Sequence, residues 1–479
     1  MRAALLTLSF LTMTGCASVS LAPDPLKMSQ VCQSSGAADG SVAVVRVYGG
    51  RRNEGFAGGQ SLAADGAGNY LVGGITQGLG SYAGNADLLL AKFLTTGETQ
   101  WVRIFGGPSI DLGKAFIRTS DGGQLEAGET FGHRHTGMGY LMLGMKHHYL
   151  LLVKTDAQGL SEWHQLYVVK VGDNYRDSDM YSVLQAADGG YAFSGSTGMN
   201  PTGKKGSKML YSDVLLAKVD ASGNVEWART YGAGGPDEAY GSTLAADGYL
   251  LAGVYSPVPG KEAADALLLK TSATGDLDWA KTFGGSKRNF FFSAVQTADG
   301  GYAAAGHTNG FGEGGKDILL IKLDEQGELL WARTYGGPED ESATSLLQTS
   351  DGGFAVVGDT SSFGDEESDA VILKTDGAGN LEWASAFGGP EAESSMSVIE
   401  PSPGKLTVLG VTQSYCDDTI VIFMLQLPEG RKSDDCTKAI SPIQSTPNLT
   451  VAEPSLSSAL VELEKLSDSL RKQQIATFE

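Results

Sequence analysis

WARTYGGPEDESATSLLQTSDGGFAVVGDTSSFGDEESDAVILKTDGAGNLEW, residues 331–383, contains one complete repeating unit and decides the fold. Glycine-rich turns divide it into four β-rich runs: WARTYGG, SATSLLQT, FAVVGDTS and DAVILKTD. The second and third runs are joined by Asp351-Gly352-Gly353. An Asp-Gly pair between two β-rich runs predicts a tight hairpin, because such turns need positive φ angles. Four short antiparallel strands per unit are typical of a propeller blade.

The unit recurs along the chain, and its clearest marker is tryptophan. All six tryptophans occupy the same position of the repeat: Trp101, Trp163, Trp227, Trp279, Trp331 and Trp383. The last four are spaced 52 residues apart, and the two earlier spacings are 62 and 64. A fixed period of this length indicates a solenoid, a propeller or an array. An aromatic residue follows each tryptophan by four positions, on the same face of its strand.

The two ends of the repeat region predict how the ring closes. Seven copies of the second run occur before residue 430, but the seventh unit ends without a tryptophan strand. Residues 41–50, SVAVVRVYGG, match WARTYGG in phase, with Val44 in the tryptophan position. We therefore predict an all-β fold, a seven-bladed β-propeller over residues 41–430 with four antiparallel strands per blade. The N-terminal strand should complete the last blade and close the ring.

These units resemble the tandem DGG-and-Trp β-propeller repeats of exported bacterial and archaeal proteins, within the Kelch-like or quinoprotein-like propellers. The resemblance covers residues 41–430 and implies a propeller, but no shared catalytic activity. One unit departs from it, with Val168-Val169 where the others have two glycines. The pattern Lys-x-Asp-x-x-Gly-x-x-x-Trp, as in Lys322 to Trp331, is similar to the tryptophan-docking turn of quinoprotein-like propellers. That similarity implies that each tryptophan ring fills the space between neighbouring blades.

The N-terminus has the pattern of an export signal. Arg2 precedes a short apolar stretch, and the segment ends Met13-Thr14-Gly15-Cys16, which resembles a bacterial lipobox. Residues 1–15 would then be a signal peptide, Cys16 the lipidated first mature residue, and residues 16–40 a tether. The resemblance implies an exported, lipid-anchored protein at the outer membrane or cell surface. The alternative is ordinary signal cleavage nearby, with Cys16 lost.

Three further cysteines are present, and an oxidising compartment favours one disulfide. Cys32 lies nine residues before the N-terminal strand, and Cys436 lies nine residues after the last strand of the seventh unit. We expect Cys32–Cys436 as a staple over the ring joint, contributing about 2–4 kcal/mol through loop-closure entropy. Cys416–Cys436 is the alternative.

The C-terminal region after the propeller has a different composition. Residues 431–453 include a stretch rich in Pro, Ser and Thr and are interpreted as a linker. Residues 454–479 are predicted to form a short amphipathic helix. Its apolar stripe would be Leu456, Leu460, Leu463, Leu466 and Leu470. The helix could pack on the propeller or on a partner, and the sequence does not choose between them.

Composition excludes one class of partner. The formal net charge is −21, whereas sequence-independent nucleic-acid binding needs a basic surface. An acidic surface is typical of a soluble protein.

One acidic residue recurs before the fourth run of the unit. It is present in six of seven units: Asp87, Asp213, Asp265, Asp317, Asp369 and Asp418. The seventh position holds His148. A residue repeated in every blade usually satisfies the same turn in every blade, so we interpret this ring of carboxylates as structural rather than catalytic.

The strongest deviations from the repeat are two insertions. Units two and three are longer than 52 residues by 10 and 12, and the additions fall near residues 131–147 and 198–212. In a propeller these loops leave the same face, where function commonly resides. The first loop holds four of the six histidines: His133, His135, His147 and His148. With the methionines between them they could bind copper or zinc; otherwise the loop packs on its blade or contacts a partner.

Three functions are compatible with this sequence. We favour a membrane-anchored, non-enzymatic binding or scaffold protein of the cell envelope, which contacts a protein or an envelope polymer through the loops of blades two and three. Copper or zinc handling through residues 133–148 is the second hypothesis. A glycan-active enzyme is the third, because it needs a paired carboxylate or a nucleophile that stands out from the repeat, and none is evident.

Overall fold

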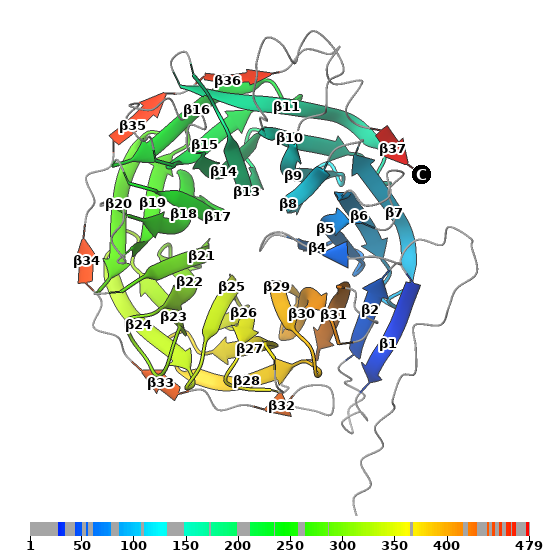
Figure 1. The fold of residues 1–479 in the computed structure, drawn as a ribbon, viewed down its shortest axis with the longest axis vertical. Helices are drawn as coiled ribbons and strands as arrows, with labels where there is room; N and C mark the ends of the chain where they lie inside the picture. The colour runs from blue at the N-terminus through cyan, green and yellow to red at the C-terminus, as the bar shows by residue number, and fades with distance from the viewer. Residues whose placement is uncertain are drawn as a thin grey trace, which may run out of the picture.

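Seven β-sheets are arranged as blades around a central channel (Figure 1). The computed structural model describes residues 44–49, 54–55, 61–77, 86–106, 110–131, 148–171, 174–198, 211–233, 235–256, 264–285, 287–364, 367–414 and 420–428, together with short terminal strands within 27–33 and 438–478. All regular elements of this part are strands. The predicted all-β propeller with seven blades and four antiparallel strands per blade is therefore confirmed.

Each blade starts at the channel and ends at the rim. Blade one has β3 (Glu54–Gly55) and β4 (Leu62–Ala64) at the channel, then β5 (Tyr70–Thr76), β6 (Asp87–Phe93) and β7 (Thr99–Gly106). Blade two has β8 (Ile110–Arg118), β9 (Gln124–Phe131), β10 (His148–Thr155) and β11 (Ser161–Val171), which also pairs with β12 (Asn174–Arg176). Blade three has β13 (Ser178–Gln185), β14 (Tyr191–Thr197), β15 (Asp213–Val219) and β16 (Val225–Gly232).

Blades four to seven repeat this order. Blade four has β17 (Glu238–Ala245), β18 (Gly248–Tyr255), β19 (Asp265–Ser272) and β20 (Leu277–Gly284). Blade five has β21 (Asn289–Gln296), β22 (Tyr302–Thr308), β23 (Asp317–Leu323) and β24 (Leu329–Gly336). Blade six has β25 (Glu341–Gln348), β26 (Phe354–Thr360), β27 (Asp369–Thr375) and β28 (Leu381–Phe387). Blade seven has β29 (Glu393–Ser402), β30 (Lys405–Thr412) and β31 (Val421–Leu427).

The fourth strand of blade seven comes from the other end of the chain. β2 (Val44–Gly49) pairs antiparallel with β31, so that Val45 lies opposite Leu425. Val45 and Val47 are buried in one apolar cluster with residues of β31. Ring closure by the N-terminal strand is confirmed, and the packing of these valines links the two ends of the repeat region.

Successive blades are joined by the tryptophan strands, which form the outer strand of each blade. Trp227 lies against the glycine turn of the next blade at Gly275, and its ring centroid is 6.1 Å from that of Tyr249. Four residues on, the buried Tyr231 donates a hydrogen bond of 2.5 Å to the carbonyl of the same glycine. Gly275 has a φ of 76°, and a Cβ there would collide with the Trp227 ring. One strand face thus holds the neighbouring turn by stacking and by hydrogen bonding.

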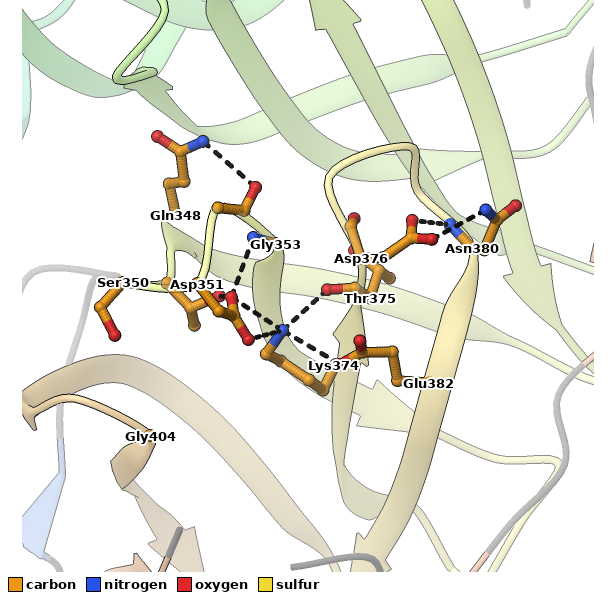
Figure 2. Close-up of polar contacts among 12 residues, drawn as sticks. Gln348, Ser350, Asp351, Gly353, Lys374, Thr375, Asp376, Asn380, Glu382 and Gly404 are labelled. Carbon is orange, nitrogen blue, oxygen red and sulfur yellow. Dashed lines mark hydrogen bonds and ion pairs between the residues drawn. The ribbon is translucent and has the colours of Figure 1, made fainter. Parts of the chain in front are cut away.

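In blades one to six, a lysine holds together the two turns at one end of the blade, as Figure 2 shows for blade six. Lys374 Nζ lies 2.9 Å from Asp351 in the hairpin and 3.2 Å from Glu382 on the outer strand, and donates to the carbonyl of Thr375 at 2.8 Å. Five other blades have the corresponding lysine–aspartate pair: Lys92–Asp65, Lys154–Asp121, Lys218–Asp188, Lys270–Asp247 and Lys322–Asp299. We call this end the hairpin face, and the opposite end, where the long loops leave the sheets, the loop face.

The C-terminal region differs from the prediction. Its described parts are six short strands, and the predicted helix over 454–479 is wrong where β35 (Ser457–Leu460), β36 (Glu462–Lys465) and β37 (Ala476–Phe478) lie. The predicted linker contains β32 (Lys438–Ala439), β33 (Ile443–Ser445) and β34 (Thr450–Ala452). The apolar stripe is a local signal, whereas the outer strand of each blade offers unpaired backbone groups. Pairing with those groups overrides the helical pattern.

These six strands form a belt around the rim (Figure 1). In chain order, β32 to β37 pair antiparallel with the outer strands of blades six, five, four, three, two and one: β28, β24, β20, β16, β11 and β7. The outer strand of blade seven is covered instead by β1 (Lys27–Gln33). Closing the ring does not remove the outer sheet edges; the two chain ends cover all seven.

Cys32 lies in β1 opposite Val45, but Cys16, Cys416 and Cys436 are outside the described residues, so the expected disulfide and the lipidation site stay predictions. The part of the chain that is described contains no helix long and apolar enough to span a membrane.

We expect deletion of residues 437–479 to expose the outer strands of six blades but not that of the seventh. Amide hydrogen exchange should become faster in the outer strands of blades one to six, because their edge hydrogen bonds to the belt are lost. β2, which β1 covers, is the internal control. Unchanged exchange in all seven outer strands, or equal acceleration in β2, would contradict this assignment of the belt.

Candidate functional site

At the loop face, the repeated aspartate and the first glycine of the Gly-Gly pair fit together. In blade three, a Cβ on Gly232 would overlap the Asp213 carboxylate, and the same holds for Gly284 with Asp265. The pairs in blades one, five and six are equivalent: Gly106 with Asp87, Gly336 with Asp317, and Gly388 with Asp369. The glycine is required because the carboxylate occupies the space of its missing side chain. Asp418 is outside the described residues.

Blade two departs from both halves of this pair. His148 begins β10 at the aspartate position, and Val168 of β11 occupies the glycine position. Where the aspartate is absent, a branched side chain is present. This joint change explains the sequence departure at Val168 and supports a packing role for the aspartates.

A second acidic position, near the start of the inner strand, binds the backbone of the crossover between blades. The buried Glu341 accepts hydrogen bonds from the backbone of Gly337 at 2.6 Å and from the hydroxyl of Thr360 at 2.8 Å. Asp237 accepts from the backbone of Ala233 and Ser256 in the same way, at 3.0 Å each. These carboxylates are bound by their own turns.

The central channel is where the blades differ chemically. A cavity of about 360 Å³ lies along it and is lined by the inner strands of all seven blades. Its size is within the range of small-molecule sites, roughly 300–1,000 Å³. Because every inner strand lines the channel, corresponding positions of the repeats lie around one cavity.

Six of the inner strands have a β-bulge, and four of the residues at the bulge line the cavity: Tyr181, Tyr240, Phe292 and Thr344. The register of six inner strands shifts at the same repeat position, and bulges of this kind re-aim side chains. The residues at the bulge share no chemistry: Lys114, Tyr181, Tyr240, Phe292, Thr344 and Met396. Flanking positions such as Met180, Ala239 and Phe291 are buried between blades. The bulge position therefore varies from blade to blade more than the buried positions beside it.

Three consecutive blades place aromatic rings at the bulge. The Tyr181 and Tyr240 ring centroids are 5.5 Å apart with planes inclined by 56°, and those of Tyr240 and Phe292 are 5.1 Å apart and inclined by 43°. Phe290, two residues before Phe292 on β21, stacks beside it at 6.1 Å. We call Tyr181, Tyr240, Phe290 and Phe292 the aromatic wall. Its rings follow one another around the channel in the order of blades three, four and five.

Charged groups lie at both sides of the wall. Tyr240 donates a hydrogen bond of 2.8 Å to Glu238, whose other oxygen lies 3.4 Å from the Ser212 hydroxyl. Lys114 Nζ is 5.8 Å from the centroid of the Tyr181 ring, which is a cation–π distance.

Two buried titratable groups support the wall from behind. The His307 ring contacts Phe290 and Phe292 at 5.0 and 5.5 Å, and burial, with a smaller effect of Lys316, lowers the pKa of His307 to about 4. Glu129 accepts a hydrogen bond of 3.2 Å from the backbone of Met180. Burial raises the pKa of Glu129 to about 7; nearby Lys114 opposes this, and Asp179 adds to it. Both groups are enclosed by protein, so they position the wall.

This arrangement can hold a ligand by ring contacts and by charge. The aromatic wall provides π faces, Glu238 provides a partly exposed carboxylate, and Thr344 lines the cavity from a neighbouring blade. Such a wall suits binding, since aromatic side chains supply large, rigid contact area.

The predicted metal site lies almost wholly outside the described residues. His133, His135 and His147 are in the undescribed loop, and His148 is described only by its backbone in β10. Within the described residues, no cluster of three or more His, Cys, Asp or Glu side chains could hold a metal ion. The two long loops leave the sheets after β9 and β14, at the loop face, next to the end of the channel where the wall-bearing inner strands begin.

Sequence reasoning missed the aromatic wall. It treated SATSLLQT and its counterparts as interchangeable strands and searched for motifs or insertions. Alignment of the inner strands by their Asp-Gly hairpins would have placed Tyr181, Tyr240 and Phe292 in one column with Lys114 and Thr344. The residues of that column share no chemistry, whereas the residues at the apolar positions around it do. This contrast is the sequence signal that could have identified the aromatic wall.

Comparison with known proteins gives limited relationships. No family model matches the chain. The regulatory protein FlaEY of Caulobacter vibrioides is 30% identical over 138 residues, which is 26% of this chain and only 14% of that protein.

Among solved structures, a protein of unknown function from Dyadobacter fermentans is similar with 11% identity and a TM-score of 0.42, over 80% of this chain and 96% of that chain. A puromycin hydrolase mutant in complex with PGG has 15% identity and a TM-score of 0.47, over 80% and 54%. A gluconolactonase-like protein has 11% identity and a TM-score of 0.31, over 86% and 100%.

We expect Gly284→Ala to destabilise the protein by roughly 1–3 kcal/mol, because the new Cβ overlaps the Asp265 carboxylate. Asp265→Ala in the same chain should recover more than half of that loss. Urea unfolding of the two single variants and the double variant measures the coupling. Additive effects of the two substitutions would show that the glycine and the aspartate do not depend on each other.

We expect Glu129→Gln to stabilise the protein at pH 8 but not at pH 5. The folded-state pKa of about 7 lies above the value of about 4.5 for a free glutamate, so the native protein loses stability as pH rises through this window. The gain at pH 8 should be about 1–3 kcal/mol by urea unfolding. Glu325→Gln, an exposed residue of the hairpin face, removes the same charge and is the control. An equal effect of Glu129→Gln at both pH values would refute the burial argument.

Proposed function

We propose that this chain is a non-enzymatic binding or scaffold protein whose contact surface is the loop face of blades two to five. The contrast at the bulge carries the proposal. Blade-to-blade contacts repeat around the ring, whereas the channel side chains change from lysine to tyrosine, phenylalanine, threonine and methionine. A position that differs from blade to blade and gathers three aromatic rings beside a cavity is best explained by a ligand.

The long loops of blades two and three belong to the same surface. They follow β9 and β14 at the loop face, and the inner strands of these blades supply Lys114 and Tyr181. A partner that enters the channel from this side would meet both the loops and the wall. The proposed partner is a protein or an envelope polymer.

Scaffolding is favoured over glycan hydrolysis by the state of the carboxylates. Glu341 and Asp237 are bound by their own turns, and Glu129 is buried against the backbone of Met180. A hydrolase of the two-carboxylate type needs acidic side chains that face the substrate. Beside the aromatic wall, Glu238 and Asp179 are only partly buried, and neither is bound by a turn in the way that Glu341 and Asp237 are.

We further propose that the protein is exported and anchored to the outer membrane or cell surface by lipid on Cys16. The support is the lipobox-like ending of residues 1–15. Several acyl chains hold a protein at a membrane stably, whereas a single chain does not. The belt and β1 would then lie at the rim of a tethered propeller.

Photo-crosslinking in intact cells tests the contact surface. A benzophenone amino acid at Met396, a bulge position opposite the wall, should yield a crosslinked partner. The same group at Ala187, an exposed residue of the hairpin face, should not. Shortening residues 133–147 should weaken the crosslink from Met396. Equal crosslinking from both faces, or none from Met396, would refute this surface.

A further inference from the structure

We infer that the aromatic wall binds an organic cation, an ammonium or quaternary ammonium group that rests on the rings of Tyr240 and Phe292. This inference rests on the proposed binding function and names its ligand class. It follows from ring geometry, from the charges beside the rings and from a cation that the protein itself places there.

The ring geometry suits a rounded head group. Tyr181, Tyr240 and Phe292 come from three consecutive blades, and neighbouring planes are inclined by 56° and 43°. Tyr181, Tyr240 and Phe292 therefore do not lie in one flat plane, whereas the fourth ring of the wall, Phe290, is parallel to Phe292 within 4°. Each ring face is negative because of its quadrupole, so a set of inclined faces attracts a compact positive group.

The acidic groups beside the rings have the matching sign, although Lys114 and Arg118 are cations of the same channel. Glu238 holds the Tyr240 hydroxyl at 2.8 Å and is only partly buried, so its carboxylate lies next to the ring that would carry the cation. Asp179 occupies the corresponding position of the neighbouring inner strand, two residues before Tyr181. The whole chain has a net charge of −21, which favours the approach of cations over long range.

The protein's own lysine shows the interaction at one end of the wall. Lys114 Nζ lies 5.8 Å from the Tyr181 ring, in the position that a ligand ammonium would adopt on the next ring. Among the described side chains, no lysine or arginine is placed over Tyr240 or Phe292 in this way. The Tyr181 end of the wall is therefore supplied with a cation, and the Tyr240–Phe292 end is left for a ligand.

The cavity has room for a group of this size. Its volume is about 360 Å³, and Tyr240, Phe292 and Thr344 all line it. Water is displaced from ring faces at little cost, whereas a cation keeps its attraction to them. A neutral ligand of the same shape would gain only the apolar contact.

The test compares choline with 3,3-dimethylbutan-1-ol, its neutral isostere, on the purified soluble chain. Saturation-transfer NMR and calorimetric titration should show choline binding more tightly by about fivefold or more, and binding that weakens as salt rises. Tyr240→Leu should abolish this preference, and Glu238→Gln, which keeps a partner for the Tyr240 hydroxyl, should reduce it. Glu325→Gln removes the same charge at the hairpin face and should leave it unchanged. Thermal unfolding shows that each variant is folded.

Three outcomes would overturn the cation assignment. These are equal binding of choline and its isostere, choline binding that survives Tyr240→Leu in a folded variant, and binding of a neutral disaccharide in place of choline. None of them would remove the crosslink from Met396, which belongs to the contact surface as such. Loss of that crosslink would refute the proposed function, whereas its persistence beside a failed choline titration would refute only the ligand class.

Discussion

The contact of each outer strand with the next blade is the constraint on which the rest of the structure depends. A tryptophan stacks on a positive-φ glycine, as Trp227 does on Gly275. Where the residue four positions later is a tyrosine, as at Tyr231, its hydroxyl donates a hydrogen bond to the carbonyl of that glycine. A four-stranded sheet cannot bury both of its faces alone, so each blade is stable only beside its neighbours. Each interval between tryptophans in the sequence therefore corresponds to one step from blade to blade around the ring. A buried lysine, such as Lys374 in blade six, fixes the turn on which the tryptophan of the preceding blade docks.

The two faces of the propeller differ in how much their residues vary from blade to blade. At the hairpin face, the same lysine–aspartate pair recurs in blades one to six, so this face is chemically similar in those blades, while blade seven has Gln426 at the lysine position. At the loop face, repeated acidic residues such as Glu341 form hydrogen bonds with the crossovers between blades. The differences between blades are concentrated in the channel and in the two long loops. In a fold of this kind, the channel side chains can change while the contacts between blades stay the same.

The blades were predictable because their signals are local and repeated. Asp351-Gly352-Gly353 fixes a hairpin from three residues, and Val44 in the tryptophan phase identifies the closing strand. The belt was not predictable, since the pattern around Leu460 is compatible with a helix and only the unpaired edges of folded blades make it a strand. The aromatic wall was hidden for a related reason: Tyr181 and Phe292 are far apart in sequence, and although each bulge lies within one blade, only the ring brings the blades together around one channel.

The belt also relates the number of repeats to the length of the tail. Its strands meet the blades in reverse order, from β28 back to β7, and each pairs over only two to four residues. During synthesis the tail emerges last, when every outer strand already exists. Loss or duplication of one repeat, a frequent change in genes built of near-identical segments, would put every later strand of the tail out of step with its blade. The number of strands in the tail is thus matched to the number of blades, and a change in the number of blades would require a matching change in the tail.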